Sequence, residues 1–113
     1  MKMTNEPRRY RNISLAITNS SQDAYTCPAN TTAIIKEIIV TNIDGTNNAD
    51  VTLSLHDGSA SSAKAFVSTK QVDADTFLRL DSANIYLEAS DKIQAVASAT
   101  GDLNLFLFLE EYY

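Results

Sequence analysis

The sequence predicts an all-β protein: a single antiparallel β-sandwich or jelly roll of about eight strands, with an N-terminal extended basic arm. Three observations lead to this prediction. From Ile13 onward, apolar residues recur at every second position, which is the period of a strand. Clusters of Asn, Asp, Gly, Ser and Thr separate these segments at intervals of roughly 8 to 12 residues. The length of 113 residues fits one compact domain.

Charge divides the chain into two segments, an arm at residues 1–11 and a sandwich domain at residues 12–113. The arm holds four basic residues and one acidic residue, a balance of +3, whereas the remainder holds 5 basic and 13 acidic residues, a balance of −8. The arm has no apolar periodicity, so we expect it not to fold by itself. It is either a frayed terminus or an arm that docks on an acidic neighbour, with Tyr10 as an aromatic anchor. We expect deletion of residues 1–11 to leave the body folded.

The strands follow one another with turns between them. Period-two alternation or short apolar runs mark the segments 13–18, 24–27, 33–43, 51–56, 63–72, 77–80, 85–87, 93–98 and 103–110. The spacing in 33–43 would also permit a helix, but its β-branched residues favour a central strand covered on both faces. The loop at 44–50 predicts a hairpin, so that 33–43 and 51–56 should pair with each other in antiparallel fashion.

The last strand is apolar on both of its faces. Four leucines alternate with Phe106 and Phe108, and Tyr112 and Tyr113 extend the apolar strip to the terminus. One face of a strand in a two-layer sandwich usually meets water. The phenylalanine face should therefore be covered either by a loop or arm of the same chain or by another subunit. The expected interface residues are Arg8, Arg9, Tyr10, Arg11, Phe106, Phe108, Tyr112 and Tyr113.

The sequence offers no catalytic constellation, so we predict that the protein is not an enzyme. His56 lacks a partner nucleophile in any recognisable motif, and Cys27 stands before a proline without basic or metal-binding neighbours. The loop at 44–50 has the oxygen ligands that calcium prefers but fails the hand-type spacing, so a hairpin loop is favoured over a calcium site. Asp73 and Asp75 fit a solvated turn better than a glycosidase pair. We therefore expect no cofactor and no metal.

Composition also limits the partners. A net charge of −5 and a pI near 4.6 argue against nucleic acid. The sequence has no apolar run of about 20 residues and no signal-peptide pattern, so we predict no membrane partner. One cysteine cannot form an internal disulfide.

Three stretches, residues 25–34, 42–53 and 87–95, resemble small virion structural proteins of tailed bacteriophages. That group shows a Y-x-x-P-A-N/G-T-T-A entry, a long apolar strand and a late L-x-A-G-D-x-I turn. This chain has Ser90 where glycine is common, which affects the geometry of one turn. The likeness covers roughly residues 24–109.

The resemblance implies a non-enzymatic β-sandwich protein of the virion, assembled in the host cytoplasm. Its role would be that of a capsid decoration or cement protein, with a neck, tail or baseplate subunit as the alternative. Implied partners are other virion proteins, such as the major capsid protein or neck and tail proteins, and further copies of the chain. Independently of the resemblance, a second alternative is a carbohydrate-binding module that attaches to host glycans, since β-sandwiches often bind sugars and tyrosines can stack on sugar rings.

Overall fold

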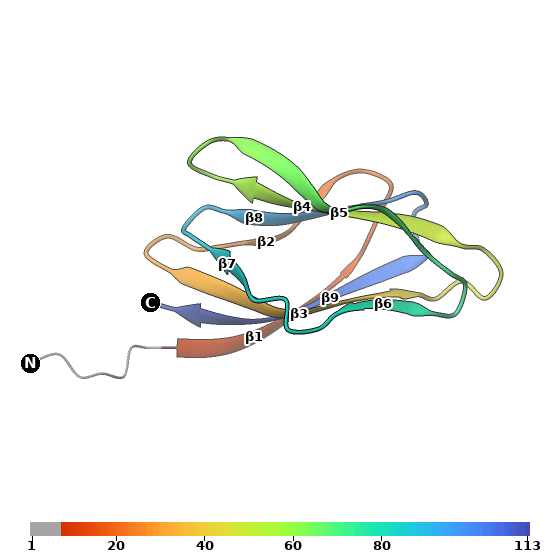
Figure 1. Cartoon of the computed structure of the whole chain (residues 1–113), viewed down its shortest axis with the longest axis horizontal. Helices are drawn as coiled ribbons and strands as arrows, with labels where there is room; N and C mark the ends of the chain where they lie inside the picture. Colours follow the sequence, from red (N-terminus) through yellow and green to blue (C-terminus); the bar gives the residue numbers. More distant parts are fainter. Residues whose placement is uncertain (1–7) are drawn as a thin grey trace, which may run out of the picture.

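The computed structural model describes residues 8–113, which form nine strands in two antiparallel sheets (Figure 1). The strands are β1 Arg8–Ala16, β2 Gln22–Thr26, β3 Thr32–Asn42, β4 Ala49–Asp57, β5 Ser62–Val72, β6 Phe77–Leu80, β7 Ile85–Leu87, β8 Lys92–Ala97 and β9 Leu103–Tyr112. One sheet has the order β1-β9-β3-β6, with β7 also paired to β3, and the other has the order β2-β8-β4-β5. The prediction of an all-β antiparallel sandwich is confirmed.

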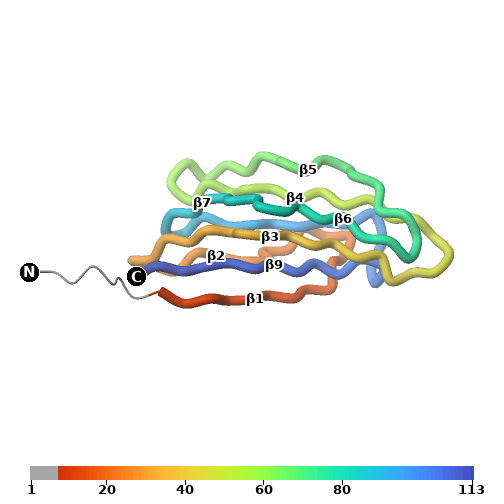
Figure 2. The backbone as a smooth tube through the Cα atoms, turned by 60° about the horizontal axis from the view of Figure 1, so that its bottom comes forward, coloured from red at the N-terminus to blue at the C-terminus, as the bar shows by residue number. Residues whose placement is uncertain are grey.

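The core lies between the two sheets. The leucines at 103, 105, 107 and 109 of β9 are all buried, as are inward apolar residues of β3 beside them and of β4 and β8 in the opposite sheet. Figure 2 shows β9 between β1 and β3, with the second sheet behind them. Because side chains of a strand alternate between faces, the intervening residues of β9 point away from the core.

A β-bulge in β3 explains why its apolar residues have a helix-like spacing in the sequence. The register of β3 against β9 shifts between Ile35 and Glu37, so Lys36 is the extra residue. The bulge places Ile35 and Ile38, three positions apart, on the same buried face. The prediction of a central strand is confirmed, since β9 lies on one side of β3 and β6 and β7 lie on the other. Its outer face is only half-buried at Ile34 and Ile39, less than the expected cover on both faces.

The expected hairpin between β3 and β4 is wrong. The two strands belong to opposite sheets, and the loop between them crosses the sandwich. Buried Asn42 fixes this crossing: its side-chain amide donates to the carbonyl oxygens of Asn47 (3.0 Å) and Val72 (2.9 Å), and its side-chain oxygen accepts from the Asp44 N–H (2.9 Å). Sequence alternation specifies which face of a strand is buried but not which strand lies beside it, so the hairpin could not be told from the crossing.

The first strand starts earlier than the sequence pattern indicated. Residues 8–11, which we assigned to the arm, pair with β9 from Arg8↔Tyr112 to Arg11↔Leu109 in unbroken register. The remainder of the predicted arm, residues 1–7, lies outside the described residues. Pairing with β9 supplies the hydrogen bonds that an isolated segment without an apolar pattern would lack.

The turn after β7 has a backbone geometry that glycine adopts more readily than other residues. Ser90 adopts a φ of 73°. The loop after β4 packs against this turn so closely that a Cβ on Gly58 would lie 2.7 Å from the Ser90 carbonyl oxygen. The buried Asp91 carboxylate joins the two loops by accepting from the N–H groups of Gly58 and Glu88, both at 2.9 Å.

Candidate assembly interface

The outer face of the β1-β9-β3 sheet carries several aromatic and aliphatic side chains among polar ones. Strand pairing places Phe106 beside Ile39, and Phe108 lies one step further along β9. We call this surface the aromatic face; its members are Tyr10, Ile34, Ile39, Phe77, Tyr86, Phe106 and Phe108. Three of them are strongly exposed, with relative accessibilities of 70% for Tyr10, 63% for Phe77 and 72% for Tyr86, and Phe108 is partly exposed at 39%. No loop of the described chain covers these four side chains.

The outer face of the other sheet is polar over β2, β4 and β8, whereas its edge strand β5 carries Phe66, which is 39% exposed. Its outward positions pair as Thr52↔Val96, Ser54↔Gln94 and His56↔Lys92. The carboxylate of Asp23 on β2 accepts hydrogen bonds from Lys92 (3.0 Å) and Gln94 (2.9 Å). Only Val96 is apolar among these pairs. These three strands therefore differ in chemistry from the aromatic face, as expected if they meet water and the aromatic face meets protein.

The charged groups Arg79, Glu110 and Arg8 on the aromatic face each have a partner within the chain. Arg79 forms an ion pair with Glu37 across β6 and β3. The hydroxyl of Tyr112 donates to Glu110 at 2.5 Å, and the Arg8 guanidinium lies 5.3 Å from the Tyr10 ring centroid. A protein surface without strong net charge can approach another copy of an acidic chain with little repulsion.

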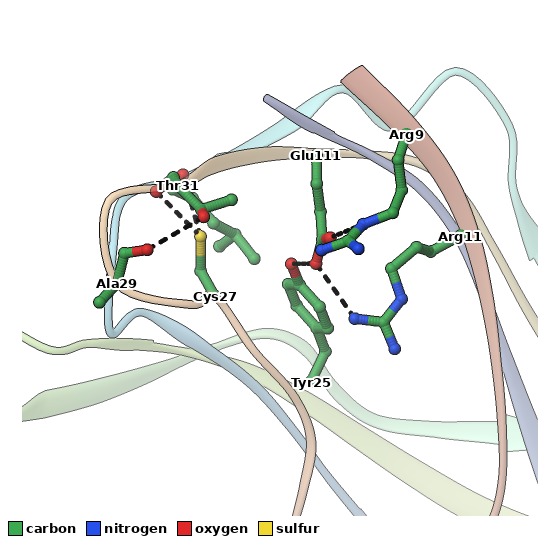
Figure 3. Close-up of polar contacts among 8 residues, drawn as sticks. Arg9, Arg11, Tyr25, Cys27, Ala29, Thr31 and Glu111 are labelled. Atoms are coloured by element: carbon green, nitrogen blue, oxygen red, sulfur yellow. Dashed lines mark hydrogen bonds and ion pairs between the residues drawn. The ribbon is translucent and has the colours of Figure 1, made fainter. Parts of the chain in front are cut away.

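A buried carboxylate anchors the start of β1 to the body (Figure 3). Glu111 is fully buried near the end of β9, and its two oxygens accept from Arg9 Nε (2.9 Å) and Arg11 Nη1 (3.2 Å). The hydroxyl of Tyr25 on β2 donates to the same carboxylate at 2.5 Å. Figure 3 shows both arginines reaching from β1 toward Glu111, with Tyr25 rising from the other sheet. This cluster, here called the Glu111 cluster, links β1, β9 and β2.

The hydrogen bonds decide the ionisation of the Glu111 cluster. Burial acts to raise the pKa of Glu111, but the donors from Tyr25, Arg9 and Arg11 outweigh burial and lower the pKa below the ordinary value of 4.5. Burial, followed by the bond to Glu111, raises the pKa of Tyr25 above its usual range. Glu111 is therefore an ionised carboxylate and Tyr25 a neutral donor at neutral pH.

The structure divides the eight expected interface residues into two groups. Arg8, Tyr10, Phe106, Phe108 and Tyr112 occupy outward positions of the β1-β9 pair. The other three lie elsewhere: Arg9 and Arg11 bind Glu111, and the Arg9 guanidinium also lies 4.9 Å from the ring centroid of Tyr113. Whether these residues contact a partner stays a prediction.

Sequence reasoning missed part of the aromatic face. It did not place Ile34 and Ile39 of β3, Phe77 of β6 or Tyr86 of β7 on the same surface as Phe108. The signal in β3 was present, because apolar residues occupy both of its faces, but which neighbours β3 has is a property of the sheet order.

The other candidate sites take structural roles in the described residues. Cys27 is buried, its thiol donates to the Thr31 carbonyl oxygen at 3.3 Å, and burial raises its pKa, which favours the unreactive thiol. Asp44 accepts from the N–H groups of Thr46 and Asn47, as a turn-forming aspartate does. Within residues 8–113 no three His, Cys, Asp or Glu side chains are placed to share a metal ion. That stretch also holds no helix with the length and apolarity to span a membrane.

No protein-family model matches the sequence, and no curated protein is significantly similar to it. Solved structures do share the fold. A protein of the Bacillus endospore appendages, which form disulfide-linked pili, is 15% identical, with a TM-score of 0.56 over 94% of this chain and 86% of that one. A chain of the cyanophage Pam1 capsid is 12% identical, with a TM-score of 0.51 over 99% and 89%. A chain of infectious bursal disease virus, strain Gx, is 13% identical, with a TM-score of 0.51 over 93% and 36%.

The chain thus shares its fold with viral capsid and pilus proteins. At these identities the likeness establishes the β-sandwich architecture and no more.

Proposed function

We propose that this protein is a non-enzymatic structural subunit of a virus particle, of the capsid decoration or cement type, which attaches through its aromatic face. The observation that carries the proposal is the contrast between the two outer faces of the sandwich. Tyr10, Phe77, Tyr86 and Phe108 are all exposed on one outer face, which suits packing on a neighbouring protein better than contact with water.

One further observation supports this role. The fold occurs in a phage capsid chain and in a bursal disease virus chain. A weak single contact suffices for such a subunit, because many copies on a particle bind together.

The first test is copy number in particles purified from host cells that carry the gene, by quantitative mass spectrometry against the major capsid subunit. Copies comparable to the shell subunit support a decoration or cement role. A few to a few dozen copies would place the protein in the neck, tail or baseplate instead. Absence from particles would overturn the virion proposal and bring the glycan-binding alternative forward, to be checked on a glycan array.

A variant series tests the face itself. Tyr10→Ser with Phe108→Ser removes two exposed aromatic rings from the aromatic face, and Val96→Ser removes an apolar side chain from the polar face as a control. Aromatic anchors at interfaces each contribute on the order of 1 to 2 kcal/mol, so we expect incorporation of the double variant to fall by at least about tenfold. Equal incorporation of both variants would show that the aromatic face is not the contact.

A further inference from the structure

Strand β1 is an edge strand with unusual regularity. Its nine residues pair with β9 in one continuous register, without a bulge or a proline. The other outer strands of the described residues are less regular: β2 and β5 carry register shifts, and β6 and β7 have four and three residues. Bulges and short length protect sheet edges from pairing with another chain, and β1 lacks both.

The free hydrogen-bonding groups of β1 belong to its even-numbered residues. The N–H of Ile17 donates to the Leu103 carbonyl oxygen at 2.9 Å. In an antiparallel ladder this orientation alternates, so the odd residues of β1 bond to β9. The backbone N–H and C=O groups of Arg8, Tyr10, Asn12, Ser14 and Ala16 therefore point away from the sheet.

We propose that β1 pairs with β1 of a second copy of this chain, antiparallel, about a two-fold axis at Asn12. This register sets Tyr10 opposite Ser14 of the second copy and Arg8 opposite Ala16. The backbone N–H and C=O groups of the even-numbered residues, which point away from β9, then bond to those of the second copy. The proposal deepens the proposed function, because it names a partner at the edge of the same sheet and makes the aromatic face continuous across two copies.

Charge excludes the registers shifted toward the N-terminus. Strand length disfavours those shifted the other way, because only an axis at Asn12, the midpoint of β1, pairs all nine of its residues. With the axis at Asn12, Arg9 lies opposite Leu15 and Arg11 opposite Ile13, and no arginine faces another. An axis at Arg11 would set that residue opposite its own copy, and an axis at Tyr10 would set Arg9 opposite Arg11. Like charges directly opposite each other destabilise a pair of strands.

The arginines of β1 do not prevent this pairing. Arg9 and Arg11 both bind Glu111, so one carboxylate offsets half of their charge within the chain. Ile13 and Leu15 are only half-buried in the single copy. In the pair, the aliphatic stems of the facing arginines lie across these two side chains and cover apolar surface.

Disulfide trapping tests the two-fold axis with the full chain in solution. In Asn12→Cys, the two introduced cysteines occupy a hydrogen-bonded pair with Cα atoms about 5.5 Å apart, within disulfide range. The control is Tyr10→Cys on the same strand, whose two copies lie four residues apart, roughly 13 Å. Cys27 is buried and common to both variants. We expect at least tenfold more covalent dimer from Asn12→Cys than from Tyr10→Cys under mild oxidation, and equal yields would overturn the pairing.

A second variant reports on the backbone. Ser14→Pro removes an N–H that points away from β9, so circular dichroism should show a folded sandwich while sedimentation shows loss of the dimer. A folded proline variant that still dimerises would also refute the pairing. Failure here is distinguishable from failure of the proposed function, because the purified chain is assayed without particles. Absence of the dimer beside face-dependent incorporation would refute only the strand pairing, whereas a dimer absent from particles would refute only the virion role.

Discussion

Glu111 shows how one polar residue is held inside an apolar sandwich. A buried carboxylate is costly unless charged or polar donors surround it. Here the donors come from two other strands, with Arg9 and Arg11 on β1 and Tyr25 on β2. Loss of one donor leaves the other two hydrogen bonds to the carboxylate. Loss of the carboxylate leaves all three donors without their common acceptor.

We expect Glu111→Gln to lower the free energy of unfolding by about 2 to 3 kcal/mol, because a neutral amide keeps the volume but loses the charge-assisted bonds. The half-exposed arginines can turn to water, which limits the loss. Urea denaturation at neutral pH measures it. Tyr25→Phe removes a single donor, so we expect it to lower the free energy of unfolding by less. A Glu111→Gln protein as stable as wild type would contradict the role given to the cluster.

The same residue predicts a pH dependence. The folded pKa of Glu111 lies below its ordinary value of 4.5, so its contribution is complete above that value and is lost as the pH falls through the folded pKa. Between about pH 5 and pH 3, wild type should therefore lose more stability than Glu111→Gln. Other carboxylates titrate in both proteins and cancel in the difference. Parallel stability curves for the two proteins would show that Glu111 has no lowered pKa.

At the scale of elements, the start of β1 belongs to the fold. From the sequence, we expected that deletion of residues 1–11 would leave the body folded. The structure revises this expectation, because residues 8–11 pair with β9 and two of them form ion pairs with Glu111. Deletion of residues 2–7 is the matched control, since it ends before the strand begins.

We expect deletion of residues 2–11 to lower the free energy of unfolding by about 3 kcal/mol more than deletion of residues 2–7, since it leaves a buried charge unpaired. Thermal and urea denaturation of the two truncated chains measure the difference. If both truncations were equally stable, Arg9 and Arg11 would not be the groups that compensate Glu111.

At the scale of the whole molecule, the inner face of a strand packs in the core and its outer face forms the surface of the sandwich. Adjacent residues of β9 illustrate this: Leu107 is fully buried between the sheets, whereas Phe108 stands 39% exposed on the aromatic face. One residue contributes to the stability of the sandwich and the next is available to a neighbour.

We expect Leu107→Ala to lower the free energy of unfolding by about 2 to 4 kcal/mol through loss of packing and a cavity. Phe108→Ala should cost less than about 1.5 kcal/mol, since it removes a partly solvated ring from an outer face. Urea denaturation of the two variants gives the comparison. A Phe108→Ala protein as destabilised as Leu107→Ala would mean that the aromatic face is part of the core.

The sequence alone determined that this protein is an antiparallel β-sandwich, where most of its strands lie and which side chains of β9 are buried, because each strand displays its own alternation. Only the tertiary structure decided that β3 and β4 lie in opposite sheets and that Arg9 and Arg11 form ion pairs with Glu111. It also gathered Tyr86 and Phe77 with Phe108 on one face. Strand order and register arise from contacts between residues far apart in the chain, and the period of a single strand carries no record of its neighbours.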